Sequence, residues 1–166
     1  TANPLFLQSC DFDKALNDFE KEKHRLISSG ILNEKQGGAL LENKIKDFLK
    51  SELCTRMKNA EKLYREKQFA VFLPAYMFDE TLPDYAKNEP VFVQGMADAV
   101  FVENGRAYVV DYKTDRVNNP AELVERYKKQ MEIYILAMRQ TLRLDADTAY
   151  IYSLEKEETI IYRVEA

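Results

Sequence analysis

The sequence has few of the residues on which several common enzyme chemistries depend. Its 166 residues include one histidine, two cysteines and no tryptophan. A single histidine excludes a two-histidine metal site and leaves little from which to build a serine-histidine-aspartate triad. We interpret His24, in the charged run EKEKHRLISSG, as a solvated helix residue. Cys10 and Cys54 are too few for a four-thiolate zinc or iron-sulfur centre, so we expect both to be small buried residues of helices.

Long apolar runs and a strong basic charge are also missing. No stretch approaches the roughly 20 apolar residues of a membrane span, and the first residues do not form a signal segment, so we expect a cytoplasmic protein. The formal net charge of -4 disfavours a general attraction to phosphate backbones. Any action on nucleic acid would therefore need metal ions, local basic patches or a larger partner. Glycine-lysine followed by serine or threonine does not occur, which excludes a nucleotide-binding loop of that type from the sequence.

The remaining composition is typical of one globular α/β domain. With 46% hydrophobic and 31% charged residues, the chain has enough apolar material for a core. We expect a single domain over residues 1–166, with a helical part at about 1–64 and an α/β core at about 65–166. The chain begins at Thr1 without a methionine, which suggests a piece of a longer protein.

Apolar spacing and capping residues predict the elements of the first half. The pattern predicts helices over 11–28, 33–49 and 51 to about 63, and a strand over 69–78 that stops around Pro74. Asn33 and Gln36 have the spacing of a capping box at the start of the second helix. An acidic, proline-bearing loop is expected at 79–90.

The segment VFVQGMADAVFVENGRAYVVDYK, residues 91–113, predicts a β-hairpin. Its two apolar runs are joined by Asn104-Gly105, the residue pair most typical of a two-residue hairpin turn. Counting back from this turn places Asp98 directly opposite Asp111, with β-carbons about 4.5 to 5.5 Å apart. Both runs are apolar on both faces for most of their length, so we expect interior strands.

The opposed carboxylates of Asp98 and Asp111 indicate a divalent-metal site. Two carboxylates on a largely buried face repel each other and lose hydration unless they share a proton or a cation. Oxygen ligands at this spacing suit Mg²⁺ or Mn²⁺, and the backbone carbonyl of Tyr112 is a further candidate ligand. Lys113, on the same face as Asp111, would orient the attacking water and offset transition-state charge. A surface Asp-Lys pair at a strand end is the alternative interpretation.

A long helix is predicted after the hairpin. Asn119 would be its N-cap, Pro120 its first residue and Glu122 part of its first turn. Its inner face carries Gln130 and Tyr134 one turn apart. Periodicity by itself favours a structural role, in which Gln130 bonds to a loop and Tyr134 packs.

Three short motifs, in this order and spacing, resemble the RecB-type nuclease domains of the PD-(D/E)XK superfamily, and most closely the C-terminal nuclease domain of AddA-type (RexA) helicase-nucleases. They are the GxxD element at 95–98, the DYKT element at 111–114 and the Q-x-x-x-Y element at 130–134. A weaker likeness extends to REKQF, with Glu66 at the family's glutamate, and to the final strand pair in YIYSLEKEETIIYRV.

The resemblance implies a restriction-endonuclease-like α/β fold, a mixed central β-sheet flanked by helices with a helical N-terminal part, and Mg²⁺-dependent cleavage of DNA. It implies catalytic roles for Asp98, Asp111, Lys113, Gln130 and Tyr134, with Asp98 and Asp111 as metal ligands. The parent enzyme would be an exonuclease acting in double-strand break repair and recombination. It would work with an AddB-type partner subunit, and ATP would act only through a helicase region that is not in this chain.

The opening residues TANPLFLQ depart from the family pattern G-T-A-x-H-x-x-x-Q. Pro4 stands where the family has a histidine that serves as a further metal ligand. A nuclease with fewer protein ligands is one interpretation. The other is a catalytically impaired, nuclease-like module that is retained for DNA guidance or for contact with another subunit.

Overall fold

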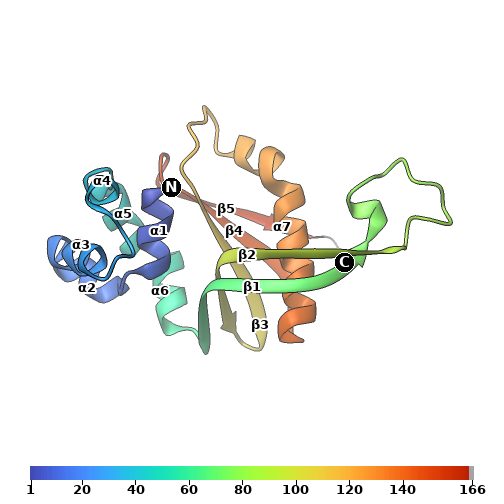
Figure 1. Ribbon diagram of the computed structural model, residues 1–166, viewed down its shortest axis with the longest axis horizontal. Coiled ribbons are helices and arrows are strands. Elements are labelled where there is room, and N and C mark those ends of the chain that lie inside the picture. The colour runs from blue at the N-terminus through green and yellow to red at the C-terminus, as the bar shows by residue number, and fades with distance from the viewer. Residues whose placement is uncertain (165–166) are drawn as a thin grey trace.

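The computed structural model describes residues 1–164, which fold into a five-stranded sheet between two layers of helices. Helices α1 to α6 pack on one face of the sheet and α7 packs on the other (Figure 1). In chain order the elements are α1 (Ala2–Ser9), α2 (Phe12–Asn17), α3 (Phe19–Ser28), α4 (Glu34–Gly38), α5 (Glu42–Leu49), α6 (Glu52–Asn59), β1 (Lys62–Pro74), η1 (Ala75–Met77), β2 (Pro90–Glu103), β3 (Arg106–Lys113), α7 (Ala121–Leu142), β4 (Asp145–Ser153) and β5 (Glu158–Arg163). The mixed sheet flanked by helices, with a helical N-terminal part, is confirmed.

The strands lie in the order β1-β2-β3-β4-β5. β1, β2 and β3 pair in antiparallel fashion, β4 runs parallel to β3, and β5 is antiparallel to β4. A parallel pair requires a crossover connection, which α7 supplies between β3 and β4. One face of α7 is thereby brought against the strand that carries the DYKT motif.

The helical part is divided more finely than the apolar pattern predicts. The predicted helix over 11–28 is two helices, because Asp18 leaves helical geometry with φ -149° and ψ 87°. Its side chain then accepts a hydrogen bond from the backbone N–H of Lys21 at 3.1 Å and caps α3. Apolar residues continue with helical spacing across this break, so the pattern does not reveal it. α1 was not predicted as a separate helix.

The next two predicted helices also differ from expectation, one by an interruption and the other by an earlier end. The segment 33–49 separates into α4 and α5 after the two glycines that end α4, although the Asn33–Gln36 capping box is present. α6 ends at Asn59 rather than near residue 63, because the chain has already entered β1 at Lys62.

The cysteines are buried and the histidine is exposed, as predicted, although Cys10 follows α1 as its C-cap and does not lie within a helix. Cys10 and Cys54 are fully buried, and burial raises the pKa of each thiol to about 12, so both are neutral packing residues. The His24 side chain is 73% exposed on α3. Along the sequence, none of the three is close to the GxxD, DYKT or Q-x-x-x-Y motif.

The hairpin of β2 and β3 has the predicted turn and register. Glu103 pairs with Arg106, and the pairing continues without a shift to Ala99–Val110, one pair short of the predicted Asp98–Asp111 pair. Asn104 and Gly105 have φ values of 52° and 72°, the left-handed conformation that this two-residue turn requires. Both strands are interior, as expected, with β1 and β4 on either side of the hairpin.

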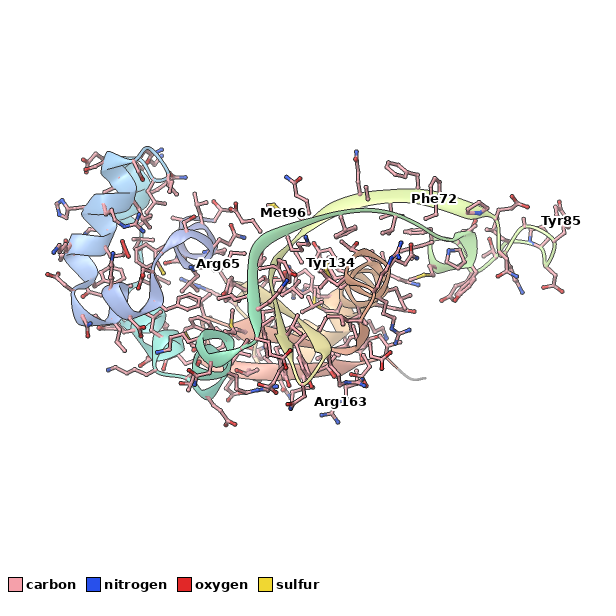
Figure 2. The ribbon with its side chains drawn as sticks, turned by 90° about the horizontal axis from the view of Figure 1, so that it is seen from below. Arg65, Phe72, Tyr85, Met96, Tyr134 and Arg163 are labelled. Carbon is pink, nitrogen blue, oxygen red and sulfur yellow. The ribbon has the colours of Figure 1, made fainter. Side chains whose placement is uncertain are left out.

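β2 separates from β3 while it stays paired with β1. The pairing of β2 with β3 ends at Ala99–Val110, whereas β1 and β2 are paired as far as Pro74 and its partner. Beyond this fork, segments 67–74 and 90–97 form a two-stranded arm that arches over α7 (Figure 2). β1 therefore begins before the predicted start at residue 69 and ends at the predicted proline.

Candidate active site

Asp98 lies at the fork, where its carboxylate bridges two separate parts of the fold. Its Oδ2 accepts a hydrogen bond from the backbone N–H of Tyr112, just past the last residue of β3 that pairs with β2, at 2.9 Å. Its Oδ1 accepts a hydrogen bond from Nε2 of Gln8 in α1 at 2.6 Å. The carboxylate is therefore fixed in place on both sides.

The opening helix α1 is held against the sheet beside this carboxylate. Arg65 of β1 donates hydrogen bonds to the backbone carbonyls of Leu7 and Cys10 at the end of α1. Pro4 lies one turn before Gln8, on the same side of the helix. Sequence reasoning did not select Gln8, although it occupies the final position of the family pattern in TANPLFLQ.

Asp111 is a buried carboxylate next to a second acid. It is 3% exposed, and within residues 1–164 its Oδ2 forms an ion pair with Lys113 Nζ at 2.9 Å but accepts no hydrogen bond of good geometry. Burial and, to a smaller extent, the nearby Asp98 carboxylate raise its pKa to about 7, while Lys113 acts in the opposite direction. The predicted closeness of two carboxylates is thus present, and the ionised form of Asp111 is disfavoured in the absence of a cation.

Lys113 is a partly buried ion-pair partner and does not lie in a surface pair. Its Nζ lies 2.9 Å from Asp111 Oδ2, and the two side chains are 16% and 5% exposed. The same Nζ donates a hydrogen bond to Gln130 Oε1 at 3.0 Å and lies 3.9 Å from the ring centroid of Tyr127. The ammonium is held in one place, with a cation-π contact on one side and acceptors on the other.

Gln130 and Tyr134 extend this cluster along α7. Gln130 Nε2 donates a hydrogen bond to the Tyr134 hydroxyl at 3.2 Å, so Gln130 contacts Lys113 and Tyr134 rather than a loop. Burial, together with the nearby carboxylates of Asp111 and Asp98, raises the pKa of Tyr134 to about 12. Tyr134 is therefore a neutral hydroxyl close to both acids.

The arm supports Tyr134 from above through one aromatic ring. Phe69 of β1 is 6% exposed, and its ring packs edge-on against Tyr134 with centroids 5.6 Å apart. A Cβ at Gly95 would lie 2.8 Å from Cζ of Phe69. Only glycine leaves room for this ring, which gives a physical reason for the glycine of the GxxD element.

The residues at the fork fit a hard divalent cation. Asp98 and Asp111 supply two carboxylates, one of which is buried and contacted by the Lys113 ammonium, and the carbonyl of Tyr112 lies next along β3. Among the described residues, no group of three or more His, Cys, Asp and Glu side chains could hold a metal. Water and neutral oxygens would complete the coordination, which Mg²⁺ accepts readily. Glu66 has an exposed side chain and a φ of 53°.

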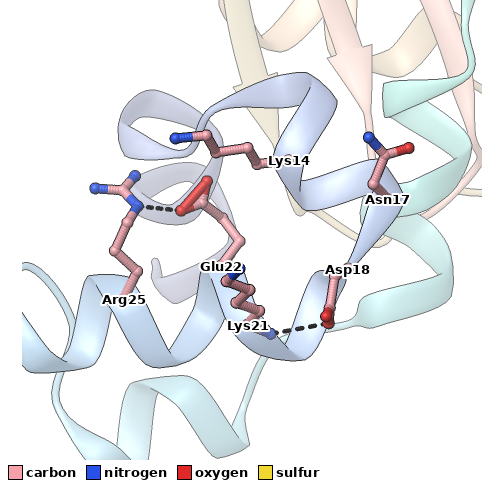
Figure 3. A pocket seen from close by; sticks show the side chains of 6 residues that line it. All are labelled: Lys14, Asn17, Asp18, Lys21, Glu22 and Arg25. Atoms are coloured by element: carbon pink, nitrogen blue, oxygen red, sulfur yellow. Dashed lines mark hydrogen bonds and ion pairs between the residues drawn. The ribbon is translucent and has the colours of Figure 1, made fainter.

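Figure 3 shows a cavity between α2 and α3. Its volume is about 320 Å³. It is lined by Lys14, Asn17, Asp18, Lys21, Glu22 and Arg25. Glu22 is 2% exposed, but it accepts a hydrogen bond from the backbone N–H of Asp11 at 3.0 Å and forms an ion pair with Arg25. Its buried charge is satisfied within the helical part, so we assign this cavity a structural role.

The motifs on β2, β3 and α7 meet in one cluster, and comparison with known families accounts for this arrangement. Residues 10–165 match the PD-(D/E)XK nuclease superfamily. The chain belongs to this superfamily. It is a nuclease domain by descent, and members of the superfamily generally use divalent metal ions.

The relatives of this nuclease domain include much longer proteins named as ATP-dependent helicase/nuclease subunits. The one from Clostridium botulinum (strain Loch Maree / Type A3) is 33% identical over 89% of this chain and 12% of its own length. The one from Clostridium perfringens (strain SM101 / Type A) is 33% identical over 95% of this chain and 13% of its own length. The one from Clostridioides difficile (strain 630) is 31% identical over 89% of this chain and 12% of its own length.

This nuclease domain therefore spans about an eighth of the length of the relatives that it matches. The match covers both the helical part and the α/β core. Among the helices of residues 1–164, none is long and apolar enough to cross a membrane.

Proposed function

We propose that this domain is a Mg²⁺-dependent deoxyribonuclease, the exonuclease domain of an ATP-dependent helicase-nuclease that acts in double-strand break repair and recombination. The observation that carries the proposal is the buried Asp111 carboxylate, which lies beside the Asp98 carboxylate and forms an ion pair with the Lys113 ammonium. A buried carboxylate in this state calls for a cation, and an adjoining ammonium suits a reaction in which negative charge develops.

Asp98, Asp111 and the Tyr112 carbonyl would hold the metal ion. When bound, Mg²⁺ or Mn²⁺ supplies charge neutralisation at the phosphate and a more acidic water. Asp98 is oriented for this role by the N–H of Tyr112 and by Gln8. A cation would also favour the ionised form of Asp111, whose pKa burial raises to about 7.

Lys113 would assist the attacking water and stabilise the charge that builds up on the phosphate. Its two contacts with Asp111 and Gln130 hold its Nζ in place before the substrate arrives. Gln130 and Tyr134 act as positioning residues: Gln130 accepts a hydrogen bond from Lys113, and Tyr134 accepts one from Gln130 and packs on Phe69. Preorganised charge of this kind lowers the barrier without a rearrangement during the reaction.

The longer relatives support the wider assignment. Their name combines a helicase with a nuclease, and this chain matches only 12% to 13% of their length. We therefore propose that ATP acts through a helicase region of the same polypeptide and that an AddB-type subunit is the partner. DNA would be the substrate.

A metal-dependent cleavage assay tests this function. The domain is incubated with linear single-stranded or duplex DNA and Mg²⁺ or Mn²⁺, with a chelator as control and Asp111→Asn as the inactive variant. We expect cleavage by the wild type only when metal is present, and none by the variant. A folded wild type that binds DNA but cleaves neither substrate with either metal would favour the alternative, an impaired module for DNA guidance or for contact with another protein.

A further inference from the structure

One side of the arm faces solvent, and packing within residues 1–164 does not account for the side chains that it carries. Its inner side carries Phe69, Val71 and Leu73, which are buried in the cluster that includes α7. Its outer side, called the outer face below, consists of three directly opposed pairs. These are Gln68–Met96, Ala70–Gln94 and Phe72–Phe92. They border an open hollow on the surface along residues 68–70 and 94–96.

The outer face is aromatic at one end and uncharged throughout. Phe72 and Phe92 are 59% and 54% exposed, with ring centroids 5.4 Å apart. Met96, near the fork, is 41% exposed. Charged residues make up 31% of the chain, yet all six positions of this face are neutral. Two neighbouring exposed phenylalanines on a neutral sheet face indicate a surface that binds a ligand.

The outer face runs directly into the metal site. Met96 precedes Asp98 by two residues on β2, so their side chains lie on the same side of the strand, which is also the side of Gln8. Six residues of strand separate Phe92 from Asp98, a distance of roughly 20 Å. Figure 2 shows Met96 and Phe72 on the outer side of the arch and Tyr134 beneath it.

A nucleic-acid strand with one phosphate at Asp98 must continue across a surface that borders the site. We propose that the outer face is this surface and that it binds the bases of an unpaired DNA strand, which stack on Phe72 and Phe92. The inference rests on the proposed nuclease function and deepens it. Bases in a duplex are stacked on each other, so only an unpaired strand offers free base faces to these rings.

The charges around the arm are compatible with binding of an unpaired DNA strand. They also limit how far along the arm this strand makes contacts. The chain carries a net charge of -4, so a polyanion is repelled least where carboxylates are absent, as on the outer face. The amides of Gln68 and Gln94 offer hydrogen bonds to base edges. Beyond the Pro74–Pro90 pair, the loop carries Asp79, Glu80, Asp84 and Glu89 against one lysine, Lys87. The bound strand should therefore end its contacts with the arm at the phenylalanine pair.

Aromatic and apolar replacements distinguish base stacking from docking of a protein. The protein is the Asp111→Asn variant with chelator present, so that no cleavage occurs, and the probe is a fluorescent oligothymidine followed by anisotropy. Phe72→Leu with Phe92→Leu keeps the surface apolar but removes both rings, and we expect its Kd to rise about tenfold or more. Phe72→Tyr with Phe92→Tyr keeps both rings and should bind as tightly as the parent. Phe78→Leu, an exposed position past the Pro74–Pro90 pair, is the matched control and should change nothing.

Salt dependence and self-association complete the test. Because both rings are neutral, the ratio of Kd between the leucine variant and the parent should stay constant as salt rises, while both affinities fall. Unchanged affinity in the leucine variant, or an equal loss in Phe78→Leu, would overturn the proposal. So would a dimer of the parent in analytical ultracentrifugation that the leucine variant cannot form, since the face would then join two copies of the chain.

The outcome for this surface is separable from the outcome for the nuclease itself. If the wild type cleaves DNA with metal while the leucine variant binds like the parent, the outer face is not the strand-binding surface and the proposed function stands. If the phenylalanines contribute to binding but the wild type cleaves no DNA, the surface stands and the nuclease function fails.

Discussion

The two halves of β2 differ although they belong to one continuous strand. The inner half, from Ala99 to Glu103, lies between β1 and β3, and most of its residues are buried. The outer half, from Pro90 to Met96, has only β1 beside it and exposes alternate residues. Asp98 stands at the boundary, where one neighbouring strand is lost.

This difference explains why the site lies where it does. A strand that leaves its neighbour exposes backbone groups, and the N–H of Tyr112 is satisfied here by a carboxylate instead of a carbonyl. The fork thus holds one acid on an edge that substrate can reach, while the sheet buries the other, Asp111, beside it. The accessible carboxylate of Asp98 and the buried carboxylate of Asp111 therefore lie next to each other at the fork.

Substitution of the two acids at the boundary between the halves of β2 is expected to have the largest effect. We expect Asp98→Asn and Asp111→Asn each to lower metal-dependent cleavage by about a thousandfold or more, since each removes a metal ligand and its charge. Circular dichroism should show both variants folded. Asp145→Asn, whose parent side chain is 86% exposed on β4, is the matched control and should keep full activity. Unfolding of an acid variant under conditions where the wild type stays folded would contradict the metal pair.

A smaller loss is expected for the ammonium beside the buried acid. Lys113→Ala should slow cleavage by about a hundredfold while metal affinity changes little, because the lysine acts mainly on the transition state. Single-turnover kinetics at saturating metal measures the first quantity and calorimetry the second. A loss of metal affinity as large as the loss of rate would show that Lys113 is structural.

Burial of the Asp111 carboxyl at the fork predicts that the stability of the metal-free protein depends on pH. The pKa of Asp111 is raised by burial and by Asp98 to about 7, above its unfolded value of 3.8, so the native state holds the proton more tightly. This contribution is complete below about pH 4 and is lost as the pH rises through 7, with a change of roughly 2 to 4 kcal/mol. Urea unfolding in chelator measures it, and Asp111→Asn should flatten the profile. A wild-type stability that rises over this interval would contradict the assignment.

The contact of the outer half of β2 with α7, which runs through Phe69 of β1, can be tested at Gly95. Gly95→Ala places a Cβ 2.8 Å from the Phe69 ring, which packs on Tyr134, so we expect about 1 to 3 kcal/mol of destabilisation and reduced activity. Thermal unfolding and the cleavage assay measure the two effects. Gly38→Ala is the control, since a Cβ there meets nothing within 4 Å and its φ is not positive. Equal stability of both variants would mean that Phe69 moves aside without cost.

The smallest expected effect concerns the helix that contacts Asp98. Pro4→His should tighten Mn²⁺ binding several-fold, about 1 kcal/mol, because Pro4 lies one turn from Gln8 on the same side of α1 and Mn²⁺ accepts nitrogen ligands. Proline within the first turn makes no helical hydrogen bond, so the exchange should leave α1 intact. Calorimetry measures the affinity. No gain by a folded variant would mean that position 4 does not reach the metal.

Local patterns predicted the turn and register of the hairpin, and the resemblance to the nuclease family selected the residues that meet in the cluster. The Asn104-Gly105 turn determines the register by counting, and the observed pairing agrees with it at every paired position. Gln130 and Tyr134 followed from helical spacing, but periodicity favoured a structural role for both. Their contacts with Lys113 and with each other required the actual packing of α7 on β3.

Other features could not be predicted because they join segments far apart in the chain. Gln8 and Asp98 are 90 residues apart, and no local pattern relates them. The break at Asp18 lies within a continuous apolar pattern, so its non-helical backbone was hidden. Phe69 looked like an ordinary strand residue, and only its position over Gly95 and against Tyr134 gives it a role.

The sequence by itself determined the turn, the strand register and therefore which acids oppose each other, since these depend on alternation and counting over a few residues. Only the tertiary structure decided where β2 leaves β3, how deeply Asp111 is buried and which side chains of α1, β1 and α7 reach the site. Burial and long-range contact depend on how whole layers pack, because the free energy of a charged group depends on all the atoms that replace its water. Asp98 and Asp111 were therefore visible in the sequence as a pair, and their difference in exposure became visible only in the fold.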